Sequence, residues 1–329
     1  MKKMTKWTVV LATVMIFGFA SCVSNVSGGD SGGGENQDTT YQFHSRVTYL
    51  AAGTAGSAGT KATYCIFGDW PQTIKAESVT VDETKSVTMG SMTYYLGSDN
   101  NYYAKCTENT FVPDSTYSDG TTVAQASANS TKCFRVEPIK WRVLNPSAEE
   151  NKILLAESIL TAYRFDDDLN NYKDSEIRAW LNDGFLNAAF TSTAQSLIAT
   201  TTVDNSAAST NPASNECTWN IGTNNYACEN TSDKIFLLSE KEATTTGYEF
   251  TEYNVYGEGN SRIRVTTDYA KANFADQNAT AGYGGLWWLR SPNADSSNSA
   301  FFINCDGSAS NYGNVSSESI GVVPALRLE

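Results

Sequence analysis

The sequence is poor in the residues that carry most enzymatic chemistry. His44 is the single histidine among 329 residues, and no cysteines form a Cys-x-x-Cys pair. Nucleophilic sites need a base, most often histidine, and structural zinc sites need clustered cysteine or histidine ligands. No glycine-rich phosphate loop follows a predicted strand. We therefore expect no enzymatic activity, no metal and no cofactor, and we interpret His44 as a solvated residue at the end of a linker.

Basic residues and long apolar runs are also scarce. Lys and Arg total 23 against 36 Asp and Glu, so the net charge is −13. An acidic surface argues against nucleic acid as a partner and against adsorption to anionic lipid. The apolar stretch over residues 7–19 is shorter than the roughly 20 residues of a membrane-spanning helix.

The N-terminus has the pattern of an export signal. Three lysines precede the apolar stretch, and the small residues Ala20 and Ser21 precede Cys22. This ending resembles the lipobox of bacterial lipoproteins. The resemblance implies that residues 1–22 are a signal peptide, that Cys22 is lipidated, and that the lipid holds the protein to the outer membrane at the cell surface.

The rest of the chain divides into a linker and one domain. Residues 23–45 are rich in Gly, Ser, Asn and Asp, a composition typical of a flexible linker. Residues 46–329 then form the predicted domain, with enough apolar residues for a sizeable core. Export permits disulfides, and Cys217 and Cys228, which flank a polar loop, are the most plausible pair. Cys305 is expected to remain unpaired.

The predicted elements are short strands, a few helices and long polar loops. Apolar alternation or apolar runs predict strands, and a strand at 135–144 should pair with one at 153–156 as a hairpin. Ser175 is a candidate N-cap for a helix that Asp183-Gly184 should stop. The other predicted elements are helices at 185–198 and 269–274 and strands at 234–238, 300–303 and 321–328. Pro324 suggests that the last strand lies at an edge or has an unpaired position there.

Two C-terminal motifs carry a family resemblance. Residues 287–292 read WWLRSP and residues 321–328 read GVVPALRL, and between them Asp306-Gly307 predicts a hairpin turn in a Ser/Asn/Gly-rich segment. The pair resembles C-type-lectin-like domains of the formylglycine-generating-enzyme type, over roughly residues 135–329. The resemblance implies an α+β fold with short strands, two or more helices and long loops.

Within that group, the chain resembles the variable proteins of diversity-generating retroelements. In those systems randomised asparagine codons never yield Lys, Glu, Gln, Met or Trp. Residues 291–317 contain none of these five, but residues 200–215 also lack them, so composition alone leaves a low-complexity hairpin equally open. The resemblance places a variable ligand-binding segment at about 287–321.

A hairpin that alternates its side chains should put every second residue on one outer face. We expect Trp287, Trp288, Arg290 and Phe301 to be buried beneath that face. Ala300, Phe302 and Asn304 should point outward together. The residues predicted to bind the ligand are Asn293, Asp295, Ser296, Ser297, Asn298, Phe302, Asn304, Asp306, Ser308, Ser310, Asn311, Tyr312, Asn314 and Ser316.

The lipobox and the family resemblance together predict a surface-displayed lipoprotein that binds a macromolecule, either a protein or another cell-surface ligand. Tyr, Ser, Asn and Gly also dominate antibody binding loops, where they supply contact area and adaptable hydrogen bonds.

Two alternatives remain. An oxidase of the formylglycine-generating type would need a partner for Cys305. A fixed carbohydrate-binding lectin could use Trp287 and Trp288, although Glu137-Pro138-Ile139 lacks the asparagine of the sugar-binding lectin motif. Asp166-Asp167-Asp168 could hold a cation, but a charged turn before a helix explains it better.

Overall fold

The computed structural model describes residues 41–113, 115–125, 130–210, 224–252, 255–278 and 280–329. The described residues lie in one unit, Thr39–Glu329. The predicted signal peptide, Cys22, most of the linker and Cys217 are outside the described residues. Among those described, no helix has the length and apolarity to span a membrane.

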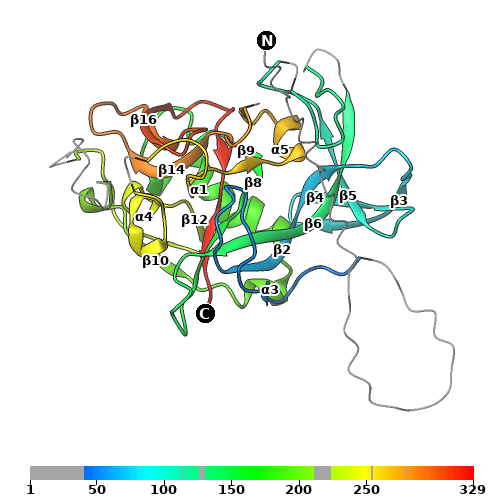
Figure 1. Ribbon diagram of the computed structural model, residues 1–329, viewed down its shortest axis with the longest axis horizontal. Helices are drawn as coiled ribbons and strands as arrows, with labels where there is room; N and C mark the ends of the chain where they lie inside the picture. The colour runs from blue at the N-terminus through cyan, green and yellow to red at the C-terminus, as the bar shows by residue number, and fades with distance from the viewer. Residues whose placement is uncertain (1–40, 114, 126–129, 211–223, 253–254, 279) are drawn as a thin grey trace, which may run out of the picture. The chain divides into compact units, whose positions relative to one another are not determined.

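The fold is mixed α+β, rich in strands and with few helices, as the sequence predicts at this level (Figure 1). The largest sheet has the order β12-β18-β7-β6-β5-β4-β3, with β2 pairing both β6 and β1. Its strands are β1 (Thr48–Tyr49), β2 (Tyr64–Ile74), β3 (Val81–Met89), β4 (Met92–Gly97), β5 (Tyr102–Thr107), β6 (Thr131–Val143), β7 (Ile153–Ala156), β12 (Ile235–Phe236) and β18 (Ala325–Arg327).

A second sheet has five strands in the order β16-β15-β14-β17-β9, so β16 is at its edge. Its strands are β9 (Thr161–Ala162), β14 (Trp287–Pro292), β15 (Ser299–Ile303), β16 (Ala309–Asn314) and β17 (Gly321–Val322). Two small pairs complete the strands: β8 (Ser158–Ile159) with β13 (Val265–Thr266), and β10 (Thr201–Val203) with β11 (Thr231–Asp233).

The helical segments are short. They are η2 (Tyr172–Asp174), α1 (Glu176–Trp180), η3 (Leu181–Phe185), α2 (Leu186–Ala189), α3 (Ser192–Gln195), η4 (Ala207–Thr210), α4 (Glu240–Thr244), η5 (Thr246–Tyr248) and α5 (Asp268–Ala272). The predicted Ser175 cap is confirmed, since its side chain accepts a hydrogen bond from the Arg178 amide. The predicted β6–β7 hairpin is also confirmed, with Trp141 opposite Ala156.

The predicted stop at Asp183-Gly184 is wrong, because the chain stays helical from α1 through η3 into α2. A Cβ on Gly184 would lie 2.8 Å from Cδ1 of Trp180, so this glycine makes room for an indole within the helix. The helix ends instead at Phe190, whose backbone is extended. The single helix predicted over 185–198 is therefore two short ones, and Thr191 caps the second.

Pro324 is not at an edge. It falls between β17 and β18, and β18 lies inside the large sheet between β12 and β7. Pro324 has no amide hydrogen to donate to a neighbouring strand. It lies where the chain passes from the five-stranded sheet to the large sheet. Its carbonyl still accepts a hydrogen bond from the Ala156 amide.

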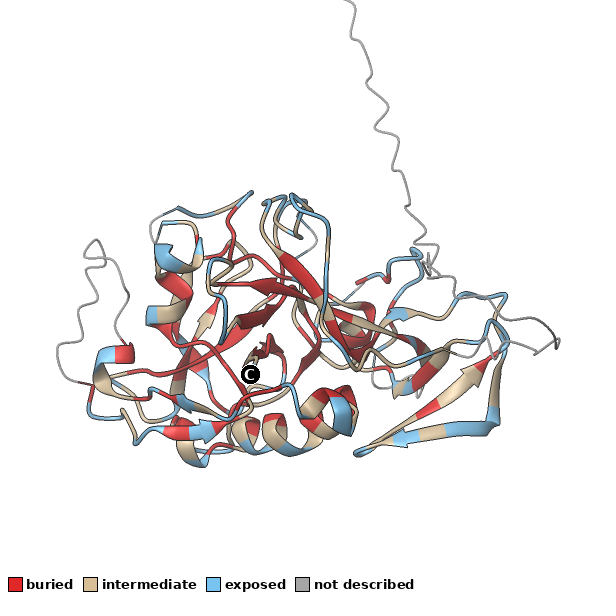
Figure 2. Ribbon diagram, turned by 90° about the horizontal axis from the view of Figure 1, so that it is seen from below, coloured by how far each residue is buried: buried red, intermediate tan, exposed pale blue. Residues whose placement is uncertain are grey.

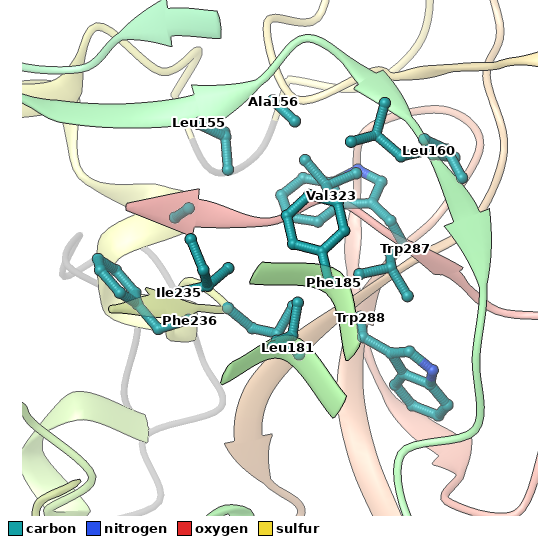
Figure 3. Close-up of a cluster of buried hydrophobic side chains, with 14 of the residues drawn as sticks. Leu155, Ala156, Leu160, Leu181, Phe185, Ile235, Phe236, Trp287, Trp288 and Val323 are labelled. Carbon is teal, nitrogen blue, oxygen red and sulfur yellow. The ribbon is translucent and has the colours of Figure 1, made fainter. Parts of the chain in front are cut away.

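One hydrophobic core includes side chains from both sheets and from the helical segments. Figure 3 shows Trp287 and Trp288 among side chains from β7, the helical segment and β12, including Leu155, Leu181, Phe185 and Ile235. Both tryptophans are 0% exposed, which confirms their predicted burial. Buried residues follow the inner strands, while exposed ones concentrate at turns and outer segments (Figure 2).

His44 and the end of the linker differ from prediction. His44 is not solvated, because its Nδ1 lies 2.7 Å from Asp69 Oδ1 and its amide donates to Asp69 Oδ2 at 2.7 Å. Asp69 is buried in β2 and also accepts a hydrogen bond from the Tyr41 hydroxyl. Residues 41–45 are thus docked on the domain, and the predicted linker boundary at 45 is too late.

Candidate ligand-binding face

The base of the predicted face is β14, in which every residue is buried. The Trp288 indole donates to the Tyr163 carbonyl at 3.0 Å, so its polar edge is satisfied inside the core. Trp288 pairs across the sheet with Phe302, and their rings meet edge to face with centroids 6.4 Å apart. The two tryptophans therefore form a scaffold beneath the hairpin, and no face of either is open for stacking on a sugar.

Arg290 is also buried, as predicted. Its guanidinium donates to the Leu237 carbonyl at 2.7 Å, to the Asp204 carbonyl at 2.9 Å and to the Glu242 carboxylate. Hydrogen bonds from one guanidinium to several elements fix those elements relative to one another. Arg290 thereby ties β14 to α4 and to the segment after β10.

The strand β15 follows the predicted alternation only in part. Phe301 is buried, as expected, and Ile303 is buried as well. Phe302, which was expected to point outward, is half-buried and packs against the buried Trp288. Ala300 was expected to point outward, but it is 0% exposed. It lies between Pro292 of β14 and Gly313 of β16, and a register shift between Ala300 and Phe302 interrupts the alternation.

The register shift puts an extra residue into β16. Phe302 pairs with Ser310 and Ala300 pairs with Gly313. Two residues of β16, Asn311 and Tyr312, therefore lie opposite the single residue Phe301 of β15, which is a β-bulge. Asn311 turns inward and is buried, while Tyr312 is 70% exposed, more than any other large apolar side chain in the described structure.

The predicted ligand-binding residues separate into three groups by exposure. Those that are exposed are Asp295, Asn298, Tyr312, Asn314 and Ser316. Those that are half-buried are Ser296, Ser297, Phe302, Asn304, Asp306, Ser308 and Ser310. Asn293 and Asn311 are buried.

The expectation that Asn293 and Asn311 are exposed is therefore wrong. The Asn293 side-chain amide donates to the Asn311 carbonyl at 2.7 Å, and its side-chain oxygen accepts from the Asp295 amide at 2.8 Å. Asn293 thus satisfies backbone groups that the bulge leaves without a strand partner. Composition could not separate this structural asparagine from its exposed neighbours.

Local hydrogen bonds stiffen the turns of the face. Asp306 Oδ1 accepts from the amide and the hydroxyl of Ser308, at 2.9 and 2.6 Å. Asn314 Oδ1 accepts in the same way from Ser316, at 3.1 and 3.0 Å. Such Asx turns hold the backbone in one shape. The face is therefore preorganised, which reduces the entropy lost when a ligand binds.

Asn170 holds one end of the hairpin, a role that no local sequence pattern indicates. Its side-chain amide donates to the carbonyls of Asn293, Ser296 and Ser299, at 3.2, 2.8 and 2.8 Å. Its own backbone amide donates to the Ser297 carbonyl at 2.7 Å. The segment before η2 therefore belongs to the face, and it adds the exposed side chain of Leu169.

The other end of the hairpin is held by the loop that follows η5. The Gly257 amide donates to the Asp306 carbonyl at 2.8 Å, and buried Arg262 donates to the Gly307 carbonyl at 2.6 Å. The loop presents Tyr256, which is 55% exposed. These contacts join residues about 50 positions apart, a separation that local sequence patterns do not reveal.

The aspartates at 166–168 form a charged turn, as predicted. Burial raises the pKa of Asp166, but hydrogen bonds from the Leu169, Asp168 and Glu176 amides outweigh it and lower the pKa overall. Asp166 thus remains ionised as it braces the turn before α1. Among the described residues, no group of three or more His, Cys, Asp or Glu side chains could hold a metal ion.

One buried carboxyl near this scaffold lacks a partner. Glu240 begins α4, its amide donates to Ser291 Oγ at 2.9 Å, and neither carboxyl oxygen has a hydrogen-bond partner. Burial raises the pKa of Glu240 to about 8. Glu240 is therefore mostly protonated at neutral pH, and it adds little charge beneath the face.

Two cavities flank this region. One, of about 340 Å³, is lined by residues that include Asp204, Lys241, Glu242 and Arg290. The other, of about 320 Å³, is lined by residues that include Ser115, Thr266, Lys271, Asn278 and Gly284. It borders the hairpin turn, because the Gly284 amide donates to the Cys305 carbonyl at 2.9 Å.

No described cysteine is in a disulfide. Cys65, Cys106, Cys133, Cys228 and Cys305 are all free. Cys305 Sγ accepts a hydrogen bond from the Asn278 side chain at 3.4 Å, so its one polar contact is an amide. Cys228, one half of the expected Cys217–Cys228 pair, is among these free cysteines, and Cys217 lies outside the described part of the chain.

Comparison with known sequences identifies the C-terminal part of the chain. A family model described as "Domain of unknown function (DUF6273)" matches residues 149–329, more than half of the chain. No curated protein and no solved structure matches the chain. The matched region begins after β6 and contains the whole candidate face.

Proposed function

The chain belongs to the DUF6273 family of domains of unknown function, and we propose that it is a surface-displayed lipoprotein that binds a macromolecular ligand through the β15–β16 hairpin and the loops tied to it. The ligand is a protein or another cell-surface component. The lipid on Cys22 anchors the protein to the outer membrane, and the linker sets the domain away from the membrane surface.

The observation that carries this proposal is the contrast within the hairpin between buried apolar side chains and exposed polar ones. Trp288, Phe301 and Ile303 are buried in the core, and Phe302 packs against Trp288 on the same face of the sheet. The hairpin also presents Tyr312 among short polar residues on a backbone fixed by its own hydrogen bonds. A rigid scaffold that displays an exposed aromatic among small polar side chains is the usual arrangement of an adaptable binding surface.

The finer proposal is that the domain has a C-type-lectin-like fold of the formylglycine-generating-enzyme type and that a retroelement diversifies its C-terminal segment. The buried WWLRSP strand and the exposed hairpin that follows it support this reading. The test is the neighbouring DNA. It should hold a near-copy of the segment that encodes Trp287–Leu328, differing at adenines, beside a reverse-transcriptase gene.

The binding role is tested by separating stability from affinity. A random 12-residue peptide library displayed on phage is selected on the full-length protein in detergent. The selected peptides are then measured against Phe302→Ser, Tyr312→Ser and Tyr49→Ser. Tyr49, on β1, is the control because it is also an exposed tyrosine.

We expect Tyr312→Ser to weaken binding at least tenfold, because large side chains at the centre of a contact carry most of its affinity. Its unfolding free energy should change by about 0.5 kcal/mol or less, as for other surface positions. Trp288→Ala, in contrast, should cost about 3–5 kcal/mol. Unfolding in both hairpin variants, or equal loss of binding in Tyr49→Ser, would contradict the proposal.

A further inference from the structure

The edge strand β16 has no neighbour on its outer side. The five-stranded sheet ends at β16, and no other described strand or isolated bridge pairs with it. Figure 1 shows β16 at the margin of the second sheet. An open edge presents backbone groups to which another strand can add.

Of the usual devices that protect an exposed sheet edge, β16 has a bulge and lacks charged residues and proline. Soluble proteins usually block exposed edges with lysine, proline or inward-pointing charges. The strand reads Ala-Ser-Asn-Tyr-Gly-Asn and contains none of these. Its one irregularity, the bulge at Asn311 and Tyr312, turns the most exposed large side chain of the face outward. The strand therefore presents an aromatic side chain beside open backbone groups.

The charged residues within the segments tied to this edge are all acidic. The segments tied to the hairpin are 165–170, 255–261 and 276–286, and with residues 291–320 they contain no lysine or arginine. Their acidic residues are Asp166, Asp167, Asp168, Glu258, Asp276, Asp295, Asp306 and Glu318. Among the neighbouring arginines, Arg262 and Arg290 are buried, and partly exposed Arg164, which precedes the first segment, is paired with Glu176.

Hydrogen bonds place these carboxylates at both ends of β16. Asn170 links the turn at 166–168 to residues 293–299, which carry Asp295. The Gly257 amide links the loop that carries Glu258 to Asp306. A cationic segment lying along β16 would therefore meet negative charge at each end and Tyr312 between them. Tyrosine also attracts ammonium and guanidinium groups through its ring.

From these features we infer that the ligand is an extended, lysine- or arginine-rich polypeptide segment that adds to β16 as a sixth strand. The inference rests on the proposed function and names the partner class for that same face. Backbone hydrogen bonds to β16 would supply affinity that does not depend on sequence, while side chains around Tyr312 would supply specificity. Charge disfavours a second copy of this chain as the occupant, because two such acidic edges would repel each other.

The first test uses the random peptides selected on the full-length protein. The selected peptides should be enriched in lysine and arginine and depleted in aspartate and glutamate relative to the library. Their affinity should fall as salt is raised from 20 to about 300 mM, because exposed charges are screened over roughly 10 Å at 0.1 M. Neutral or acidic peptides that still depend on Tyr312 would overturn this inference and leave the proposed function standing.

The second test addresses the strand edge. A selected peptide is synthesised with N-methyl groups on its central backbone nitrogens, which keeps the side chains and removes the donors. We expect at least a tenfold loss of affinity. Unchanged affinity would overturn strand addition, and a dimer of the protein without peptide in analytical ultracentrifugation would show that a second copy takes the edge.

The third test changes charge at matched positions. Asp295→Asn with Asp306→Asn removes two charges from the face and keeps side-chain oxygens that can accept the turn hydrogen bonds. Affinity for the basic peptide should fall about threefold to tenfold, as expected for two exposed ion pairs. Glu149→Gln with Glu150→Gln makes the same change in the exposed turn between β6 and β7 and should have little effect. Equal effects of the two double variants would overturn the charge argument.

Discussion

Gly313 shows how tightly individual positions of the hairpin are constrained. A Cβ there would lie 2.6 Å from Cζ3 of Trp288 and 2.9 Å from the Ala300 carbonyl oxygen. The Ala300 backbone and the buried Trp288 indole cannot move aside easily. A side chain at position 313 must therefore push the hairpin away from β14. Ser310, on the same strand, is half-buried and opposite Phe302.

We therefore expect Gly313→Ala to lower the unfolding free energy by about 1–3 kcal/mol, as for other overpacked sites. Ser310→Ala should change it by about 0.5 kcal/mol or less. Chemical denaturation of the two variants measures the difference. Similar values would mean that Gly313 is free to vary, whereas the expected result would make 313 a fixed position within the proposed variable segment.

The buried carboxyl of Glu240 predicts that the stability of the protein depends on pH. Its pKa rises from the ordinary 4.5 to about 8 in the folded protein because of burial. Between these values the unfolded chain has lost this proton and the folded protein has kept it. The group therefore makes stability fall as pH rises from about 4.5 to about 8, by at most roughly 1.4 kcal/mol per pH unit. Above pH 8 both states are ionised and the effect levels off.

Glu240→Gln removes this titration and keeps the shape of the side chain. The stability of the variant relative to the parent should increase steadily from pH 5 to pH 8, measured by denaturation at constant ionic strength. Glu149→Gln, at an exposed loop position, gives the control slope. A constant difference between variant and parent across this range would mean that the Glu240 carboxyl is solvated or paired.

Among the elements, the loop at 293–299 depends on one side chain from a distant segment. The Asn170 side-chain amide donates to the carbonyls of Asn293, Ser296 and Ser299, and the Ser299 carbonyl also accepts from the Asn293 amide. We expect Asn170→Ala to cost about 1–3 kcal/mol, since it leaves buried carbonyls without donors. Amide hydrogen exchange in residues 293–299 should increase. Ser297→Ala, at a half-buried position of the same loop, should leave exchange elsewhere in the loop unchanged.

Sequence patterns predicted elements whose burial follows a simple period. Alternation across residues 135–144 gave β6, the apolar run at 153–156 gave β7, and Ser175 marked the start of α1. The WWLRSP motif and the Asp306-Gly307 turn placed β14 and the β15–β16 hairpin. In each case one local property, period or turn chemistry, decides the structure.

Other elements could not be predicted because distant contacts decide them. β3 has almost no buried residue, so its strand state depends on pairing with β4 and not on an apolar face. Gly184 stays helical because Trp180 packs over it, and Asn293 is buried because a bulge leaves carbonyls to satisfy. Such positions have ordinary local sequence, and only the packed structure distinguishes them.

At the scale of the whole molecule, charge and attachment have separate roles. The net charge of −13 opposes adsorption to anionic lipid, and no described helix is suited to span a membrane. The start of the domain is secured by a different contact, because Tyr41 and His44 dock on buried Asp69. In our proposal, force on the lipid anchor would pass through the linker to this contact, and the binding hairpin would remain undisturbed.

The anchor itself can be tested with one substitution. Cys22→Ser removes the thiol that lipidation requires and keeps the rest of the signal. We expect the variant to leave the membrane fraction, because the lipid on Cys22 is the attachment that we propose. The acidic domain cannot replace the lipid by electrostatic attraction to anionic membrane lipids. Fractionation with a high-salt wash should leave the parent protein in the pellet. Ser21→Ala, which keeps a small residue before the cysteine, serves as the control and should stay membrane-bound. A Cys22→Ser protein that still pellets after the wash would show that the attachment lies elsewhere in the chain or in a bound partner.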